Sequence, residues 1–177
     1  MHTASTAHET LELLWNNYIT MCEQGDLGLM TPVKLSLHSE QVVPERPIRI
    51  ATWLARQGYF IATWSLWEFY ARGLRESLPK IERKGCNEST VDWVSRSLSS
   101  NGVAFSDQIW FASANCLRNL IAHNGARACG AKAEKLLDRS RTAFPHINTW
   151  RDRYIEITHC DVADLHIKIE DFIDQTA

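Results

Sequence analysis

Segment 48–78 constrains the fold most, because apolar residues recur along it at the spacing of an α-helix. Two adjacent stripes run along this segment: Ile50, Leu54, Gln57, Ile61, Trp64, Glu68 and Ala71 on one, and Trp53, Phe60, Trp67 and Leu74 on the other. Pro79 is expected to end the helix, since proline disfavours helical geometry in the residue before it. A face this wide predicts a central helix, with neighbours on more than one side.

Several other segments show helical spacing. The predicted helices cover 8–24, 88–99, 106–124, 130–141 and an acidic C-terminal segment that begins at Asp161. Short extended segments are predicted near 33–37 and 154–158, where apolar and polar residues alternate. No repeat, low-complexity tract or linker interrupts the chain. The sequence therefore predicts an all-α fold, a bundle of about five to six helices in one domain that covers residues 1–177.

Capping residues predict where two of these helices begin and end. Ser106 or Asp107 is expected to cap the helix at 106–124, and Asp161 is expected to cap the last helix. Asn124 and Gly125 form a helix stop, with the glycine in the left-handed conformation.

The composition is that of a globular protein. Of the 177 residues, 45% are hydrophobic and 23% are charged, which excludes a disordered chain. No stretch approaches the ~18 clean apolar residues of a membrane span, and the N-terminal residues lack the pattern of a secretory signal. Five cysteines without a CxxC pair favour reduced thiols. We therefore expect a cytoplasmic protein with no membrane partner.

The common motifs of nucleotide-binding enzymes, zinc proteases and serine hydrolases are absent from the sequence. His159 and Cys160 are adjacent, and Asp164 and His166 are two residues apart on a helix, so neither pair is well placed to hold one metal ion. No metal or other cofactor is expected.

The net charge of −2 conceals two basic segments, 46–85 and 118–153, each with eight basic and three acidic residues. Both ends of the chain are acidic. Either the acidic ends neutralise the basic segments in the fold, or the basic segments converge on one anion-binding surface.

The segment 115–125 carries polar residues on a helix that is otherwise apolar. Four of these residues, separated by steps of three or four, share one face: Asn115, Arg118, Asn119 and His123. Arg118 and His123 lie at the two edges of this polar stripe, about 140° apart around an ideal helix. The stripe needs a partner, which can be solvent, a polar network or a ligand. Arginine binds phosphate oxygens and histidine transfers protons near neutral pH, so the pair suits acid–base chemistry at a phosphate.

This stretch resembles the HEPN family, named for higher eukaryotes and prokaryotes nucleotide-binding domains. The family's hallmark is an arginine, four to six residues, and then a histidine, often with a polar residue directly after the arginine. Arg118, Asn119 and His123 match it, with four intervening residues. The upstream segment with Trp64, Trp67 and Glu68 is similar to the Trp- and Glu-bearing helix that precedes the motif helix in many members.

The resemblance implies a metal-independent endoribonuclease that acts as a toxin or defence effector. Two copies pair in this family, so that Arg118 of one protomer and His123 of the other reach one phosphate. By this resemblance His123 is the general base or acid, Arg118 stabilises the phosphate in the transition state, and Asn119 orients His123 or the phosphate. The products carry a 2′,3′-cyclic phosphate, and the partners are RNA, a second copy, and an antitoxin or defence-system protein. Gly125 stands where some members carry a modifiable tyrosine, so that regulation is not supported.

Further residues are expected to support the site. The supporting set is Glu68, Asn115 and Asn124, and the set that contacts the RNA backbone is Arg127, Lys132 and Lys135. An unpaired Glu68 on an apolar stripe is costly, so Arg118 or another arginine is its expected partner. That pair is either a structural ion pair or a means of aiming Arg118. The basic helix is either a solvated face or an RNA contact.

Two other functions remain open at this stage. One is a HEPN-like module that has lost catalysis and binds a nucleotide or a protein. The other is a helical regulatory protein in which Arg118 and His123 belong to a structural network.

Overall fold

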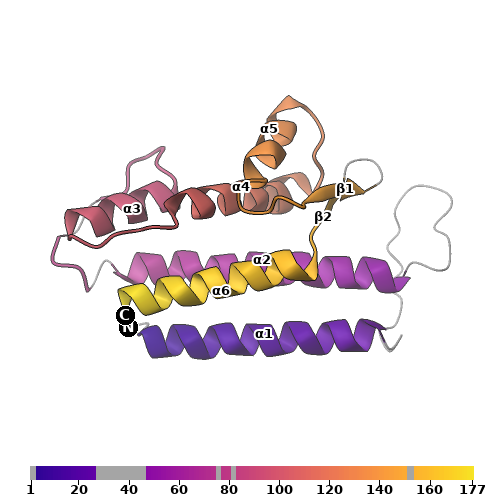
Figure 1. The fold of residues 1–177 in the computed structure, drawn as a ribbon, viewed down its shortest axis with the longest axis horizontal. Coiled ribbons are helices and arrows are strands. Elements are labelled where there is room, and N and C mark those ends of the chain that lie inside the picture. The colour runs from indigo at the N-terminus through magenta and orange to yellow at the C-terminus, as the bar shows by residue number, and fades with distance from the viewer. Residues whose placement is uncertain (1–2, 27–46, 75–76, 81–82, 151–153) are drawn as a thin grey trace.

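The computed structural model describes residues 3–26, 47–74, 77–80, 83–150 and 154–177. In chain order the elements are α1 (Ala4–Asp26), α2 (Pro47–Gly73), α3 (Thr90–Ser100), α4 (Gln108–Asn124), α5 (Ala131–Ser140), β1 (Asn148–Trp150), β2 (Tyr154–Glu156) and α6 (His159–Thr176). The predicted helical fold class is confirmed: the described residues form six helices and one small hairpin (Figure 1). The predicted extended segment at 33–37 lies outside the described residues.

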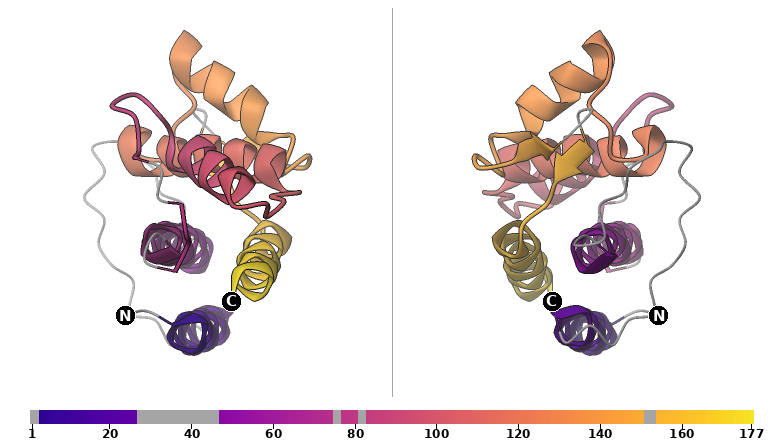
Figure 2. Two further views of the ribbon diagram at one scale, coloured as in Figure 1. Left: turned by 90° about the vertical axis from the view of Figure 1, so that its left-hand side faces the viewer. Right: turned by 90° about the vertical axis from the view of Figure 1, so that its right-hand side faces the viewer.

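The helices form a lower bundle and an upper layer. α1, α2 and α6 make up the bundle, in which each helix contacts the other two, and α3 and α4 lie end to end above α2 and α6 and run along them (Figures 1 and 2). α5 projects from the outer side of α4. α2 contacts α1, α3, α4 and α6, which confirms the prediction of a central helix.

One continuous hydrophobic core contains residues from all six helices and from β2. Phe60, Trp64 and Trp67 of α2 are fully buried in it, and Trp67 stacks on Phe111 of α4 with 4.9 Å between ring centroids. Each such side chain contributes about 1.5–3 kcal/mol through burial. The aromatic side chains of α2 are therefore core residues, and their contacts with Phe111 hold α4 against α2.

α2 is shorter than predicted. It ends at Gly73, before Pro79, because glycine is a poor helix former and the backbone hydrogen bonds of the following turn no longer continue the helix. The carbonyl of Leu74 accepts backbone N–H groups from both Ser77 and Leu78 at 3.1 Å. Toward the N-terminal end of α2 the buried face is narrower than predicted, because Leu54, which shares the predicted apolar stripe, is 42% exposed.

The predicted N-cap of α6 is wrong, whereas Asp107 holds the N-cap position of α4 as predicted. Thr158 caps α6, and Asp161 is the third helical residue of a capping box whose carboxylate accepts the backbone N–H of Thr158 at 2.7 Å. Asp107 precedes α4 but makes no side-chain cap bond. Its carboxylate instead accepts from Lys168 Nζ at 3.1 Å, which links α4 to α6.

The predicted extended segment at 154–158 forms β2, which pairs with β1 in antiparallel register, Thr149 opposite Ile155. The backbone N–H of Ile155 also donates to the carbonyl of Ala126 at 2.8 Å. The hairpin is therefore attached to the chain just after the end of α4. None of the helices in the described ranges has the length and apolar content of a bilayer crossing.

Candidate functional site

The polar stripe of α4 lies on the side that the core leaves uncovered. The buried side of the helix consists of Phe111, Ser113, Ala114, Cys116, Leu117, Leu120 and Ile121. Asn115, Arg118 and Asn119 are half-buried, and His123 and Asn124 are exposed. Asn115, Arg118, Asn119 and His123 thus share one polar stripe, half-buried toward the middle of α4 and exposed at its C-terminal end, while Asn124 lies off this stripe.

The guanidinium of Arg118 is held by two acceptors. Its Nη2 lies 3.5 Å from Oε2 of Glu68, and its Nη1 donates to Oδ1 of Asn119 at 3.0 Å. The side chains of Arg118 and Glu68 are 25% and 17% exposed, so the ion pair is partly shielded from water. The predicted pairing of Glu68 with Arg118 is confirmed. Asn119 orients Arg118 here, and the structure shows no hydrogen bond between Asn119 and His123 among the described residues.

Glu68 has a second contact that the sequence did not indicate. Thr90, the first residue of α3, donates its hydroxyl to Oε1 of Glu68 at 3.3 Å. Lys84 Nζ in turn donates to the Thr90 hydroxyl at 3.0 Å. Neither residue lies at helical spacing from Glu68 or Arg118, so only the basic character of segment 46–85 could have drawn attention to Lys84.

These contacts bring the two basic segments together at one point. Lys84 belongs to the first segment and Arg118 to the second, and both lie next to the Glu68 side, Lys84 through Thr90. The carboxylate of Glu68 is therefore linked to one cation from each basic segment, directly to Arg118 and through Thr90 to Lys84.

His123 lies in the last turn of α4. Its ring is exposed and makes no hydrogen bond or ion pair with any other part of the chain that the structure describes. It is therefore open to solvent and to a ligand. No hydrogen bond or ion pair joins Arg118 to His123 in the described part of the chain.

The end of α4 is built on two successive left-handed residues. Gly125 has φ 57° and ψ 37°, as predicted for the helix stop, and its N–H bonds to the carbonyl of Leu120. Ala126 also has φ 57°, which costs a residue with a Cβ about 1–2 kcal/mol. Its full burial and the bond from Ile155 hold it there. The backbone immediately after His123 is thereby fixed to the hairpin.

The predicted RNA-contacting residues are exposed but do not form one dense basic patch. The guanidinium of Arg127 lies 5.1 Å from the centroid of the Tyr154 ring, a cation–π contact. Lys132 and Lys135 are exposed on α5. α5 also carries Glu134 and Asp138, so its net charge is small.

A second group of titratable side chains lies between α1, α2 and α6. Tyr18 bonds to His159 at 3.0 Å and Tyr59 to His166 at 2.6 Å, and the ring of Trp15 contacts all four. Tyr59 and Glu68 are nine residues apart on α2, which places them on opposite faces of the helix. This aromatic cluster is therefore separate from the Arg118 site.

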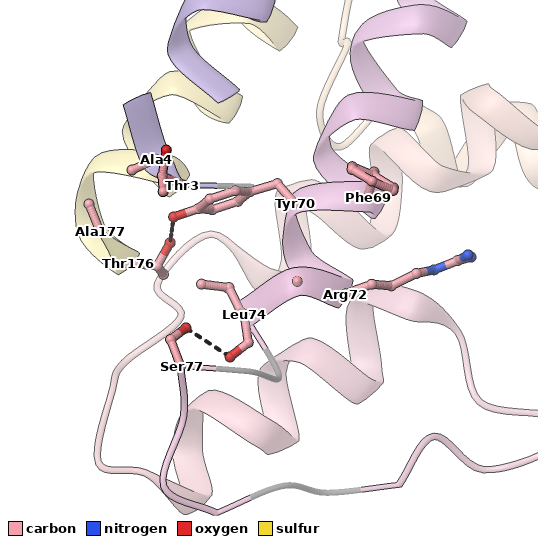
Figure 3. A pocket seen from close by; sticks show the side chains of 10 residues that line it. Thr3, Ala4, Phe69, Tyr70, Arg72, Leu74, Ser77, Thr176 and Ala177 are labelled. Carbon is pink, nitrogen blue, oxygen red and sulfur yellow. Dashed lines mark hydrogen bonds between the residues drawn. The ribbon is translucent and has the colours of Figure 1, made fainter. Parts of the chain in front are cut away.

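The structure also has a cavity of about 590 Å³ where α1 begins and where α2 and α6 end. Tyr70 and Thr176 meet in its wall through a 3.3 Å hydrogen bond, and Arg72 extends away from them (Figure 3). None of the predicted site residues lines it. Within the described ranges, no three or more His, Cys, Asp or Glu side chains gather in a way that suits a metal ion.

No protein-family profile, curated protein or solved structure matches this chain.

Proposed function

We propose that this protein is a metal-independent endoribonuclease that uses Arg118 and His123, as its resemblance to the HEPN family implies. One observation carries the proposal: α4 presents an arginine held by acceptors from two directions and, five residues later, an exposed histidine. A fixed cation and an accessible acid–base group are the two elements that phosphodiester cleavage without a metal requires.

Arg118 supplies the charge stabilisation. Glu68 and Asn119 restrain its guanidinium before substrate arrives, so little reorganisation is needed when negative charge develops on the phosphate. A quarter of the side chain remains exposed, which leaves N–H groups free to bind phosphate oxygens.

His123 supplies the proton transfer. Its neutral ring takes the proton of the ribose 2′-hydroxyl, the 2′-oxygen forms a bond to phosphorus, and the bond to the 5′-oxygen breaks. A protonated histidine then gives a proton to the departing 5′-oxygen, and a 2′,3′-cyclic phosphate remains.

A second copy of the chain completes the site. Arg118 and His123 point about 140° apart on their shared helix, so one protomer's pair does not converge on one phosphate. Two copies that face each other through the polar stripe of α4 bring Arg118 of one to His123 of the other. The biological role that goes with this activity is that of a toxin or defence effector, with an antitoxin or defence-system protein as its regulator.

The test is cleavage of a labelled single-stranded RNA in EDTA, with mass spectrometry of the product ends. We expect the wild type to produce 2′,3′-cyclic phosphate and His123→Ala to lose at least about a hundredfold in rate. His146→Ala is the matched control, because His146 is exposed and lies outside α4. Loss of activity in both variants, or in neither, contradicts the role of His123. Binding of RNA without cleavage by the wild type favours the silent module.

A further inference from the structure

We propose that Thr90 is a positioning residue that fixes the carboxylate of Glu68 and, through it, the guanidinium of Arg118. This inference rests on the proposed function for its catalytic consequence, but the order of Arg118 can be measured whether or not RNA is cleaved. Thr90 touches neither the substrate nor Arg118 in this arrangement; it acts through Glu68.

The two oxygens of Glu68 are divided between two partners. Oε1 accepts from the Thr90 hydroxyl at 3.3 Å, and Oε2 lies 3.5 Å from Nη2 of Arg118. A carboxylate on a flexible side chain can turn about its last torsion, which is broad and only weakly restrained. A contact at each oxygen removes this freedom and fixes the oxygen that faces Arg118.

Lys84 sets the direction of the Thr90 hydroxyl. A threonine hydroxyl has one proton to donate and two lone pairs to accept with. Because Lys84 Nζ can only donate, it occupies a lone pair of Thr90 at 3.0 Å. The hydroxyl proton is then directed to Glu68, which gives an ordered chain from Lys84 through Thr90 and Glu68 to Arg118.

Burial makes Thr90 effective in this role. It is 7% exposed, and the Glu68 side chain is 17% exposed, so water has limited access to replace the hydroxyl. Thr90 is also the first residue of α3, directly after the Ser89 N-cap, and the cap bond in which the Asp92 N–H donates to Ser89 Oγ holds its backbone. The position of the hydroxyl is therefore set by the start of a helix rather than by a loop.

The experiment uses the full chain and two kinds of measurement. Thr90→Val removes the hydroxyl at nearly constant shape, and Thr90→Ser keeps it. Ser97→Ala is the matched control, because Ser97 is a hydroxyl residue on the same helix, equally buried, whose Oγ has no hydrogen-bond partner among the described residues. The ¹⁵N relaxation of the Arg118 guanidinium reports its order, with the signal assigned by its loss in Arg118→Lys.

We expect Thr90→Val to make the Arg118 guanidinium mobile, while the wild type, Thr90→Ser and Ser97→Ala keep it ordered. In RNA cleavage, kcat of Thr90→Val is expected to fall about tenfold, with KM changed less than about twofold, because Arg118 acts in the transition state. A purely structural role would lower the melting temperature without this split between kcat and KM.

An ordered Arg118 in Thr90→Val overturns the proposal, whatever the activity. If the wild type cleaves no RNA, the nuclease proposal fails and the Arg118 signal alone decides the role of Thr90. If Thr90→Val does not fold, Lys84→Met serves instead: Lys84 is exposed, and its loss frees the hydroxyl to turn away from Glu68, so Arg118 is expected to become more mobile. An unchanged Arg118 signal in that variant overturns the ordered chain.

Discussion

The phenolic oxygen of Tyr59 lies 2.6 Å from Nδ1 of His166, and this contact joins α2 to α6 inside the aromatic cluster. Burial raises the pKa of Tyr59 to about 12. Burial also lowers the pKa of His166, and the nearby carboxylate of Glu170 opposes part of that effect. Both shifts keep the pair neutral, with the tyrosine as donor and the histidine ring as acceptor.

The stability of the fold is therefore expected to decrease in mild acid. The pKa of His166 is lower in the folded than in the unfolded chain, where it is about 6.5, so the unfolded chain binds the proton more readily. The contribution of neutral His166 to the free energy of unfolding is fully present above about pH 6.5 and is lost as the pH falls toward the pKa of His166 in the folded chain. Urea unfolding between pH 7.5 and 5.5, about one unit either side of the unfolded-chain pKa, measures this loss of stability.

His166→Gln keeps an acceptor for Tyr59 but does not titrate, so the free energy of unfolding of this variant is expected to depend less on pH. His146→Gln, at an exposed histidine, should show the same change in the free energy of unfolding per pH unit as the wild type. Equal slopes in all three proteins would contradict the prediction.

Glu68→Gln is expected to destabilise the protein by about 1–2 kcal/mol, because it leaves a partly buried Arg118 without its counter-charge. Arg118→Gln should cost a similar amount. The double variant should lose less than the sum of the two, since the two residues are in contact. Chemical denaturation of the four proteins gives the coupling energy, and a value near zero would show that the interaction between Glu68 and Arg118 does not stabilise the fold.

Mixing two inactive variants is expected to restore activity. If each site combines Arg118 of one protomer with His123 of the other, a mixed dimer of Arg118→Ala and His123→Ala contains one intact site. When the two variants are mixed in equal amounts, about half of the dimers are mixed, and each mixed dimer has one intact site of two. RNA cleavage should then return to about a quarter of the wild-type rate. No recovery, with exchange of protomers confirmed by mass, would exclude a shared site.

The same substitution is expected to have opposite effects at two glycines. Gly125→Ala should cost about 1 kcal/mol, because Gly125 has φ 57°. Gly58→Ala, in the interior of α2 with nothing within 4 Å of an added Cβ, should gain about 0.5–1 kcal/mol through helix propensity. Thermal unfolding compares the two. Destabilisation by both would mean that α2 is covered at Gly58 by a partner or another segment.

Lys132→Ala and Lys135→Ala are each expected to weaken RNA binding and to lower the slope of log affinity against log salt by about one. Arg72→Ala, at an exposed arginine near the end of α2, is the control and should leave the slope unchanged. If Lys132→Ala and Lys135→Ala also leave the salt slope unchanged, the basic residues of α5 form a solvated face, and RNA binds elsewhere.

Helical spacing, the glycine stop and the cost of an unpaired charge predicted those features of the fold that depend on residues close together in the sequence or on one buried group. The spacing of Trp64 and Trp67 placed them in the core, and Gly125 marked the end of α4 because only a left-handed residue closes that turn. The Glu68–Arg118 pair followed from the cost of an unpaired carboxylate on an apolar stripe. The cap of α6 was misassigned to Asp161, since a threonine or an aspartate in the right window can fill that role. Asp107 was placed correctly at the start of α4, but its carboxylate bonds to Lys168 and not to the helix N-terminus.

The contacts of Thr90 and Lys84 could not be predicted in this way. Thr90 meets Glu68 only because α3 packs beside α2, and no periodicity within either helix contains that information. Trp15, Tyr18 and His159 likewise come together from the two ends of the chain. Such arrangements depend on how whole helices pack.

We expect the Arg118 guanidinium to lose its fixed position at a lower temperature than that at which its helix unfolds. Its order depends on Glu68 of α2 and Thr90 of α3 as well as on α4, so it lasts only while all three helices stay docked. α3 is a short helix at one end of the upper layer, and such peripheral elements open locally before the core does. As the protein warms, we therefore expect the loss of a fixed Arg118 to precede the melting of α4, in a molecule that is still folded.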